Sequence, residues 1–209
     1  MNFFDLFKNK NNNFFSQSGQ DQFAYNLSGL GGFFLEIGAH HPVINSNTYK
    51  LETECEWKGI SVEFDRSFIP DWENHPERKN KVIWDNAFNL DYSLLQKQRG
   101  TLKRINYLSC DIEPPENTFN ILKKIIDAGL VFDFISFEHD KYNEGNKYDD
   151  LSNNFLSTNN YKVAIRDVYS RNKRNKVYET WYVHKDIDFE EISYKSWKKK
   201  YYNNNKFIL

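Results

Sequence analysis

Short apolar runs alternate with longer polar stretches along most of this chain, and that alternation limits the folds open to it. Each run has the length of a strand, and the segments between the runs are long enough to contain helices. The pattern predicts a doubly wound α/β sheet that is mostly parallel. The run at 131–137 is apolar almost throughout, which is typical of a central parallel strand. The predicted parallel strands are residues 33–37, 60–64, 81–87, 105–110 and 131–137.

Local signals place two helices between these strands. One is predicted over 46–56, and Ser46 or Asn47 is suited to its N-cap, because a short polar side chain can accept a hydrogen bond from a free amide of the first turn. The other begins at the two prolines at 114–115, since proline is tolerated in the first turn of a helix. Gly129 is suited to the exit from this second helix.

The last third of the chain changes character. Two strands are predicted over 161–169 and 177–183, and the polar loop 171–176 between them is short enough for a hairpin. Five parallel strands followed by an antiparallel pair is the layout of class I methyltransferases, which have a Rossmann-like fold. We therefore expect that fold class here.

The domain organisation follows from the same pattern. We expect a single methyltransferase-like domain over 16–185, preceded by a flexible lead-in at 1–15 and followed by a Lys- and Tyr-rich tail at 186–209. A chain of 209 residues can bury a sizeable core without disulfides. The tail could grip an anionic or sugar partner, but the favoured interpretation is a solvated surface that packs its aromatic side chains on the domain.

Charge and cysteine content limit the partners and the compartment. Lys+Arg 28 against Asp+Glu 29 gives a net charge of −1, so the basic footprint of a nucleic-acid-binding protein is missing. No stretch approaches the roughly 18 apolar residues of a membrane span. Cys55 and Cys110 lie in predicted regular structure, which favours free thiols and a reducing compartment, the cytoplasm. The oligomeric state is left open.

Acidic residues follow four of the predicted strands. In an open α/β sheet, ligands bind beyond the carboxyl ends of the strands, at the crevice where strand order reverses. Gly38 lets the backbone approach a ligand closely, and Glu36 can meet a cationic amine. Glu63 can accept hydrogen bonds from both hydroxyls of a ribose. The acidic residues at these strand ends are Glu36, Glu63, Asp65, Asp111, Glu113, Glu138 and Asp140.

The glycine pattern argues against a dinucleotide ligand. A dinucleotide site needs G-x-G-x-x-G and a helix N-terminus for the pyrophosphate. Here the run is Gly38-Ala39-His40-His41-Pro42, which lacks the second and third glycines. S-Adenosylmethionine has no phosphate and carries positive charge, so an acidic crevice with few glycines suits it better.

Six segments of the chain resemble the FkbM-type methyltransferases. Together they cover about residues 16–184, and the string SNTY-x-LE at 46–52 is the most specific of them. The segments are SQSGQDQF (16–23), GFFLEIGAH (32–40), NSNTYKLE (45–52), WKGISVE (57–63), DIE (111–113) and YETWYV (178–183).

This resemblance implies S-adenosylmethionine as cofactor and O-methylation of a sugar or glycosylated product as the reaction. The expected acceptor is thus a small molecule or a glycan. Two departures lie on the acceptor side: Pro114 replaces the glycine that commonly follows Asp-x-Glu, and Glu138-His139-Asp140 is more elaborate than in many relatives. The residues expected to bind the cofactor are Gln20, Glu36, Gly38, Ala39, Asn47, Thr48, Glu63, Phe64 and Asn86.

A sugar hydroxyl needs a base or a metal before it attacks a methyl group, because its proton leaves only at strongly basic pH. Asp111, Glu138 and Asp140 follow the fourth and fifth strands, which are neighbours in the usual strand order. Together they would give the all-oxygen ligand set that Mg²⁺ or Mn²⁺ prefers, with Asp111 at the reaction centre. Some sugar O-methyltransferases with this overall fold hold a metal in this way, which the arrangement resembles. Alternatively, these acids are solvated loop residues or helix caps.

Histidines are the candidate bases. His139 is the first choice, because the acids on either side of it would orient its ring and raise its basicity. His41 is the second choice, and His40 stands beside it after the first strand. His75 and His184 are interpreted as structural.

Two other functions stay open at this point. The acceptor of a methyltransferase could be RNA or a protein side chain, although the weak net charge argues against RNA. The chain could also be a non-catalytic module that binds S-adenosylmethionine without turnover. The acids at four strand ends favour an enzyme over such a module.

Overall fold

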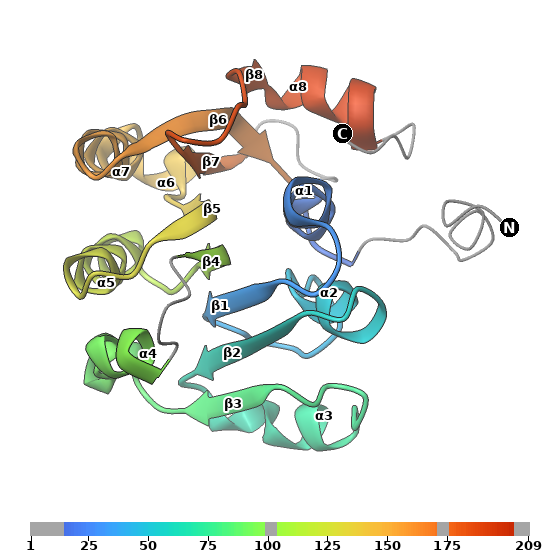
Figure 1. The fold of residues 1–209 in the computed structure, drawn as a ribbon. Coiled ribbons are helices and arrows are strands. Elements are labelled where there is room, and N and C mark those ends of the chain that lie inside the picture. Colours follow the sequence, from blue (N-terminus) through green and yellow to red (C-terminus); the bar gives the residue numbers. More distant parts are fainter. Residues whose placement is uncertain (1–14, 99–103, 171–175, 203–209) are drawn as a thin grey trace, which may run out of the picture.

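Eight strands form one mixed sheet in the computed structural model of this protein, which describes residues 15–98, 104–170 and 176–202 (Figure 1). The predicted lead-in at 1–15 and the predicted hairpin loop at 171–176 lie almost entirely outside the described residues. The strands are β1 (Phe33–Ile37), β2 (Lys58–Glu63), β3 (Lys81–Trp84), β4 (Ile105–Cys110), β5 (Phe132–Glu138), β6 (Tyr161–Tyr169), β7 (Val177–His184) and β8 (Ile192–Ser193).

The order of the strands is β3-β2-β1-β4-β5-β7-β6-β8. The first five strands of the chain pair in parallel, whereas β7 runs antiparallel to both β5 and β6. The predicted doubly wound sheet with a C-terminal antiparallel pair is confirmed, and β8 adds a short parallel edge beside β6. The chain runs outward from β1 to β3 and returns to β4 on the other side of β1. Strand order therefore reverses between β1 and β4.

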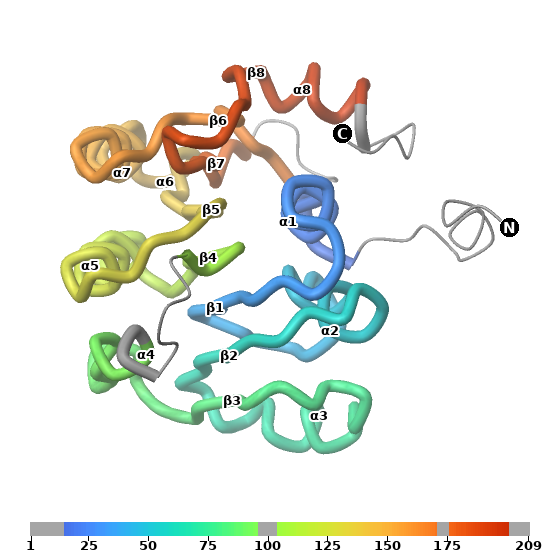
Figure 2. Tube along the Cα trace, in the orientation of Figure 1, coloured from blue at the N-terminus to red at the C-terminus, as the bar shows by residue number. Residues whose placement is uncertain are grey.

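Helices cover both faces of the sheet. In Figures 1 and 2, α4, α5 and α7 lie over one face, and α1, α2 and α8 lie over the other. No helix among the described residues is long and apolar enough to cross a bilayer. The helices are α1 (Gln20–Ser28), α2 (Tyr49–Glu54), α3 (Ile69–Glu73), α4 (Tyr92–Gln98), α5 (Pro115–Asp127), α6 (Lys141–Glu144), α7 (Lys147–Thr158) and α8 (Tyr194–Trp197), with short turns η2 (Arg66–Phe68), η3 (Ala87–Asn89) and η4 (Lys198–Tyr202).

The two faces of the sheet carry separate cores because successive strand residues point to opposite sides. In β1, Leu35 and Ile37 belong to one cluster, and Phe34 belongs to the other. The first cluster includes Leu122 and Ile125 of α5, both of which are fully buried. Each such side chain contributes roughly 1.5–3 kcal/mol by leaving water. The helix predicted to begin at the two prolines is therefore present, and it packs against β5 and α7.

The second core is aromatic and includes the C-terminal tail. Phe23 of α1 lies 4.7 Å from Phe134 and 5.1 Å from Trp181, measured between ring centroids. Trp197 of α8 lies 5.0 Å from Trp181 in an edge-to-face arrangement, which aromatic pairs prefer. Trp197 and Tyr194 are fully buried. Tyr194 and Trp197 of the tail thus pack on the sheet and are part of the core.

The start of α2 and the end of β3 differ from their predicted positions, and local hydrogen bonds explain both differences. The helix expected over 46–56 begins at Tyr49 with Thr48 as its N-cap, so the expected caps Ser46 and Asn47 were wrong. Ser46 Oγ instead accepts the amides of Thr48 and Tyr49 in the turn before the helix. The third strand ends at Trp84 rather than residue 87, because the Asn86 side chain accepts the Phe88 amide and starts η3.

Neither cysteine forms a disulfide, as predicted, and both are buried. Cys110 belongs to the first core and Cys55 to the second, so they lie on opposite faces of the sheet. Burial raises the pKa of the Cys110 thiol well above its usual range, so little reactive thiolate forms at neutral pH. A thiol reagent should label the native protein roughly 100-fold more slowly than the unfolded protein, since labelling requires opening. Rapid labelling of Cys110 in native protein, read by peptide mass spectrometry, would contradict this burial.

Candidate functional site

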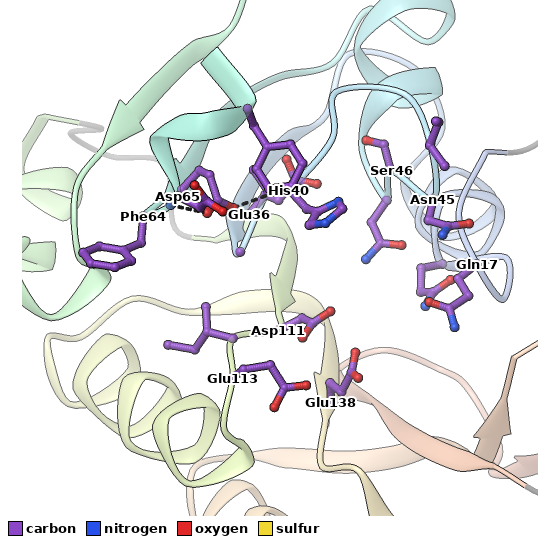
Figure 3. Close-up of a pocket in the computed structure, with 18 of the residues that line it drawn as sticks. Gln17, Glu36, His40, Asn45, Ser46, Phe64, Asp65, Asp111, Glu113 and Glu138 are labelled. Carbon is purple, nitrogen blue, oxygen red and sulfur yellow. Dashed lines mark hydrogen bonds between the residues drawn. The ribbon is translucent and has the colours of Figure 1, made fainter. Parts of the chain in front are cut away.

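A cavity of about 610 Å³ lies at the carboxyl ends of β1, β2, β4 and β5, where the strand order reverses. In Figure 3, side chains from these strand ends and from the loop after β1 surround it. Of the described residues that line it, seven are acidic and His40 is the only basic one. A cavity of this charge favours cationic or neutral ligands over phosphates. The acidic lining residues are Glu36, Glu63, Asp65, Asp111, Glu113, Glu138 and Glu179.

Gly38 forms the floor of the cavity where β1 ends. Its φ of +82° lies in the left-handed region that glycine adopts without strain. A Cβ atom at this position would stand 1.7 Å from the carbonyl oxygen of Asp111, which is a closer approach than any side chain allows. The sequence predicted a glycine that leaves room for a ligand. The structure gives it a second role, because Gly38 also lets the ends of β1 and β4 meet.

Glu63 is held firmly at the end of β2. Its Oε2 accepts the backbone amide of His40 at 2.7 Å, and its Oε1 accepts the backbone amide of Asp65 at 2.7 Å. The side chain is nearly buried, yet it lines the cavity. Each carboxylate oxygen has two lone pairs, so both oxygens can still accept a ligand hydroxyl. The backbone thus presents a carboxylate in a fixed orientation.

A smaller recess of about 350 Å³ continues from the cavity toward the end of β3. Both spaces share Gly38, Glu63 and Phe64. Phe64 is 72% exposed, which is high for a phenylalanine, and its ring offers an apolar face to anything in the recess. Asn86 lines the far side of the recess, where it also starts η3. A flat aromatic group with polar edges suits this recess.

Glu36 is buried and lines the inner wall of the cavity. Its Oε2 accepts hydrogen bonds from the hydroxyls of Thr48 at 2.9 Å and Ser61 at 2.6 Å, and it lies 3.7 Å from the guanidinium of Arg78. Burial raises the pKa of Glu36, while Arg78 opposes that rise. Thr48 itself does not line the cavity, so the structure gives it the role of orienting Glu36.

Amide side chains form the wall opposite the acids. Asn47 donates its Nδ2 to Ser109 Oγ at 2.9 Å, whereas its buried Oδ1 has no partner among the described residues. Gln20 donates its Nε2 to Glu179 at 2.8 Å and lies on the same cavity. The backbone of Ala39 completes the turn between these walls, since its amide donates to the Val62 carbonyl at 3.1 Å.

The segment before α1 is tied to both sides of the cavity. Ser16 bridges to Asn45 in the loop after β1. Ser18 Oγ accepts the hydroxyl of Tyr178 on β7 at 2.7 Å, and the Ser18 carbonyl accepts the hydroxyl of Tyr194 on α8 at 2.9 Å. The N-terminal segment therefore closes one side of the cavity and is fastened by residues from the end of the chain.

Acids from β4, β5 and β7 gather at the other side of the cavity. Asp111 and Glu138 point toward one another in Figure 3 and share a hydrogen bond. Burial raises the pKa of both carboxyls, and that of Glu138 rises furthest because Asp111 adds negative charge beside it. Glu179 stands opposite Glu138 across the β5–β7 pair, and its burial raises its pKa to about 8. These carboxyls hold protons more tightly than exposed acids do.

Solved structures show what this arrangement is similar to. A candidate O-methyltransferase from Klebsiella pneumoniae superposes with a TM-score of 0.54 at 13% identity over 80% of this chain and 80% of that chain. TrmK of M. capricolum, solved with S-adenosyl-homocysteine, superposes with a TM-score of 0.53 at 12% identity over 86% of this chain and 71% of that chain. A candidate RNA methyltransferase from Pyrococcus horikoshii superposes with a TM-score of 0.51 at 12% identity over 79% of this chain and 81% of that chain. No protein-family model and no curated protein matches the sequence.

The fold is that of the class I methyltransferases. In this class I methyltransferase sheet, β8 is an addition beyond the expected five parallel strands and antiparallel pair. The acidic cavity occupies the crevice at which an open α/β sheet binds ligands. At these identities the similarity extends to the fold alone, and the narrower resemblance to the FkbM-type enzymes stays a prediction.

The structure does not bring His139 into the cavity. Its side chain is fully buried on the other side of β5. The Lys141 amide donates to its Nδ1 at 3.1 Å, so Nε2 carries the hydrogen and donates to Thr180, whose hydroxyl donates to Asp149. Burial lowers the pKa of His139 to about 4. The acids beside it in sequence were expected to raise its basicity, but burial outweighs them, and the ring serves a structural chain of hydrogen bonds.

His41 also turns away from the cavity. Its Nδ1 accepts the amides of Val43 at 3.1 Å and Ile44 at 3.0 Å, which fixes the turn after β1. His40 lines the cavity instead, with its ring 4.1 Å from that of Phe68. Of the three histidines singled out as bases, only His40 therefore stands where a ligand can reach it.

The predicted metal site is not assembled. Within the described parts of the chain, no group of three or more His, Cys, Asp or Glu side chains is placed to hold a metal ion. Asp111 and Glu138 converge as expected, but Asp140 does not line the cavity with them. Asp140 has a φ of +47° at the start of α6, and it interacts with Tyr142 and Glu113. This change of backbone direction after β5 removes the third ligand.

Several lining residues were missed by the argument from strand ends. Gln17 and Asn45 come from the segment before α1 and the loop after β1, and Tyr178 and Glu179 come from β7. A signal for them was present, because each lies within a segment that resembles the FkbM-type enzymes. The parallel-strand rule does not reach β7, since that strand runs antiparallel and presents its first residues at this edge.

Proposed function

We propose that this protein is an S-adenosylmethionine-dependent methyltransferase. The observation that carries the proposal is Glu63, an acid at the end of β2 that two backbone amides hold inside an acidic cavity. A carboxylate held in this way keeps lone pairs for the two ribose hydroxyls of the donor. The sulfonium and amino groups of the donor carry positive charge, which the ionised acids among the lining residues attract.

The lining residues also fit the rest of the donor. The cavity of about 610 Å³ is within the usual range for small-molecule sites. Phe64 and Asn86 in the recess would hold the adenine, the first by its exposed face and the second by its polar side chain. The buried, unpartnered Oδ1 of Asn47 would accept a hydrogen bond from the methionine part, near Glu36 and Gln20.

The acids beyond this position support transfer to a hydroxyl. When bound, the donor supplies a methyl group made electrophilic by its sulfonium. Glu138 would accept the proton of the acceptor hydroxyl, since it lines the cavity and its raised pKa makes it a stronger base than an ordinary carboxylate. Asp111 beside it would raise this basicity through its negative charge and would share the proton once it has been transferred. The acceptor hydroxyl would become a methyl ether, its proton would stay on the carboxyl pair, and the donor would leave as S-adenosylhomocysteine.

A sugar or glycan hydroxyl is the acceptor that this lining supports best. The side-chain amides of Gln17 and Asn45 can both donate and accept hydrogen bonds, as neutral polyhydroxyl ligands require. RNA is the second candidate, because RNA methyltransferases share the fold. The acids lining the cavity would repel RNA phosphates, which favours the sugar.

Replacing Glu63 by alanine should weaken binding of S-adenosylhomocysteine about tenfold or more. The change removes two hydrogen bonds to a charged acceptor, each worth about 1.5–3 kcal/mol when it is well formed. Isothermal titration calorimetry with the wild type and the variant measures this directly. Because Glu63 also holds the amides of His40 and Asp65, circular dichroism should confirm that the variant is folded.

Glu73→Ala is the matched control, since Glu73 is an exposed acid at the end of α3 that does not line the cavity. It should bind the ligand like the wild type. Equal affinities for all three proteins would refute the ribose site at Glu63, and no binding by the wild type would refute the proposed function. Transfer of labelled methyl to a panel of sugars and to RNA then separates the two acceptor classes.

A further inference from the structure

Arg78 lies outside the cavity, between α3 and β3, and its side chain is completely buried. A buried arginine is costly unless all its charge is compensated. Here the compensation comes from parts of the chain that build the cavity wall. The guanidinium stacks over the ring of Trp72 at 4.5 Å, and the Trp72 indole donates to the His40 carbonyl at 2.9 Å.

The guanidinium contacts the loop after β1 at three points. One terminal nitrogen donates to the Pro42 carbonyl at 2.7 Å and to Ser46 Oγ at 3.1 Å. The other donates to Thr48 Oγ1 at 2.9 Å. Asn45 and Asn47, which line the cavity, lie between these contact points, and Ser46, which also lines it, is one of them. The conformation of this loop therefore depends on Arg78, whose side chain does not line the cavity.

The same guanidinium also acts on Glu36. It lies 3.7 Å from Glu36 Oε2, and the Thr48 hydroxyl that it binds donates in turn to that oxygen. On its other side, Arg78 Nε is 2.7 Å from Glu52 Oε2 of α2. The guanidinium of Arg78 thus lies between two buried acids, Glu36 and Glu52, and its positive charge offsets the repulsion between them.

We propose that Arg78 is a positioning residue for the methyl donor: it fixes the loop after β1 and holds Glu36 charged and oriented toward the cavity. This inference rests on the proposed function. It assigns to Arg78 no contact with the donor or the acceptor. Its effect is carried by Thr48 and by the backbone of residues 42–48.

The charge on Glu36 gives the inference a specific signature. Burial already raises the pKa of Glu36, and Arg78 lowers it. Without Arg78, Glu52 would raise that pKa further, so Glu36 would be neutral at pH values where it is now an anion. Donor affinity should then fall most at low pH and recover as the pH rises. The groups that face Glu36 are Arg78, Glu52, Thr48, Ser61 and Tyr107.

The test compares Arg78→Lys and Arg78→Met with the wild type. Lysine keeps the positive charge but lacks the rigid set of N–H donors that the guanidinium presents. The affinity for S-adenosylhomocysteine should therefore fall about tenfold or more at every pH. Methionine removes both, so its loss of affinity should be greater at pH 6 than at pH 9. In the transfer assay, the KM for S-adenosylmethionine should rise in both variants with little change in kcat.

Arg104→Lys is the matched control. Arg104 also pairs with an acid, Asp133, at 3.2 Å, but it stands just before β4, at the opposite edge of the sheet from the cavity. It should leave ligand affinity and its pH profile unchanged. Thr48→Val is a second variant that removes only the link between Arg78 and Glu36, and it should show the same loss in a smaller degree.

The outcomes separate the inference from the proposed function. If the wild type does not bind S-adenosylhomocysteine, the proposed function fails. If the wild type binds and the folded Arg78→Lys and Thr48→Val proteins bind equally well, Arg78 is not a positioning residue. An unchanged pH profile in Arg78→Met would refute its control of the Glu36 charge. Should Arg78→Met not fold, the lysine and valine variants decide the matter.

Discussion

Replacing Gly38 by alanine should abolish binding of S-adenosylhomocysteine and destabilise the whole domain. The added Cβ would stand 1.7 Å from the Asp111 carbonyl oxygen, and its backbone φ of +82° disfavours any side chain. The clash would force β1 and β4 apart at the cavity floor, and the backbone strain would add to the cost. We expect a loss on the order of 3 kcal/mol or more. At about 2–4 °C per kcal/mol for a chain of this size, the melting temperature should fall by roughly 6–12 °C.

Gly145→Ala provides the control for backbone strain alone. Gly145 also has a positive φ, +65°, but nothing lies within 4 Å of the position that its Cβ would take. It should lose about 1–2 kcal/mol of stability and keep its ligand affinity. If Gly38→Ala melts and binds like Gly145→Ala, then the β1–β4 approach is not the reason for the glycine.

Replacing Glu138 by glutamine should lower kcat by about 10²–10⁴-fold, which is the usual contribution of general base catalysis. Glutamine keeps the size of the side chain but cannot take a proton. Binding of S-adenosylmethionine should change little, because Glu138 is placed on the acceptor side of the cavity. Glu144→Gln, an exposed acid on α6, should leave turnover unchanged. Single-turnover methyl transfer and calorimetry measure the two effects separately.

The pH dependence of the rate provides an independent test of the same base. The pKa of Glu138 is raised by burial and by Asp111, so the carboxyl is protonated and inactive at low pH. The rate should therefore rise with pH through a range above that of ordinary carboxyls, and Glu138→Gln should lose this rise. If His139 were the base, its pKa of about 4 would place the rise in acid, and the rate would be flat near neutral pH.

The strands follow from the sequence because the signal for each of them is local. Each strand is a short apolar run closed by an acid or a turn, and parallel pairing brings those closing residues to one edge. Glu63 and Gly38 could be placed at the cavity in this way. The same reasoning found Asp111 and Glu138, which do converge.

His139 shows where that reasoning stops. It is adjacent to Glu138, but successive strand residues point to opposite faces, so one enters the cavity and the other turns inside the domain. Its partners Asp149 and Thr180 come from α7 and β7, which no local pattern connects to the end of β5. Arg78 was missed for the same reason, since its partners are distributed over the chain from residue 36 to residue 52.

The hydrogen bonds made by Ser18 affect the order in which the site is completed during synthesis. Gln17 and Gln20, among the earliest residues of the cavity wall, flank Ser18, and its carbonyl is fastened by Tyr194 of α8. The ribosome therefore makes the first part of the wall long before the residue that anchors it. A growing chain that has reached the end of β7 already has every acid of the cavity but not this anchor. Tight binding of the proposed donor is therefore expected only once α8 has been made and has packed against Ser18.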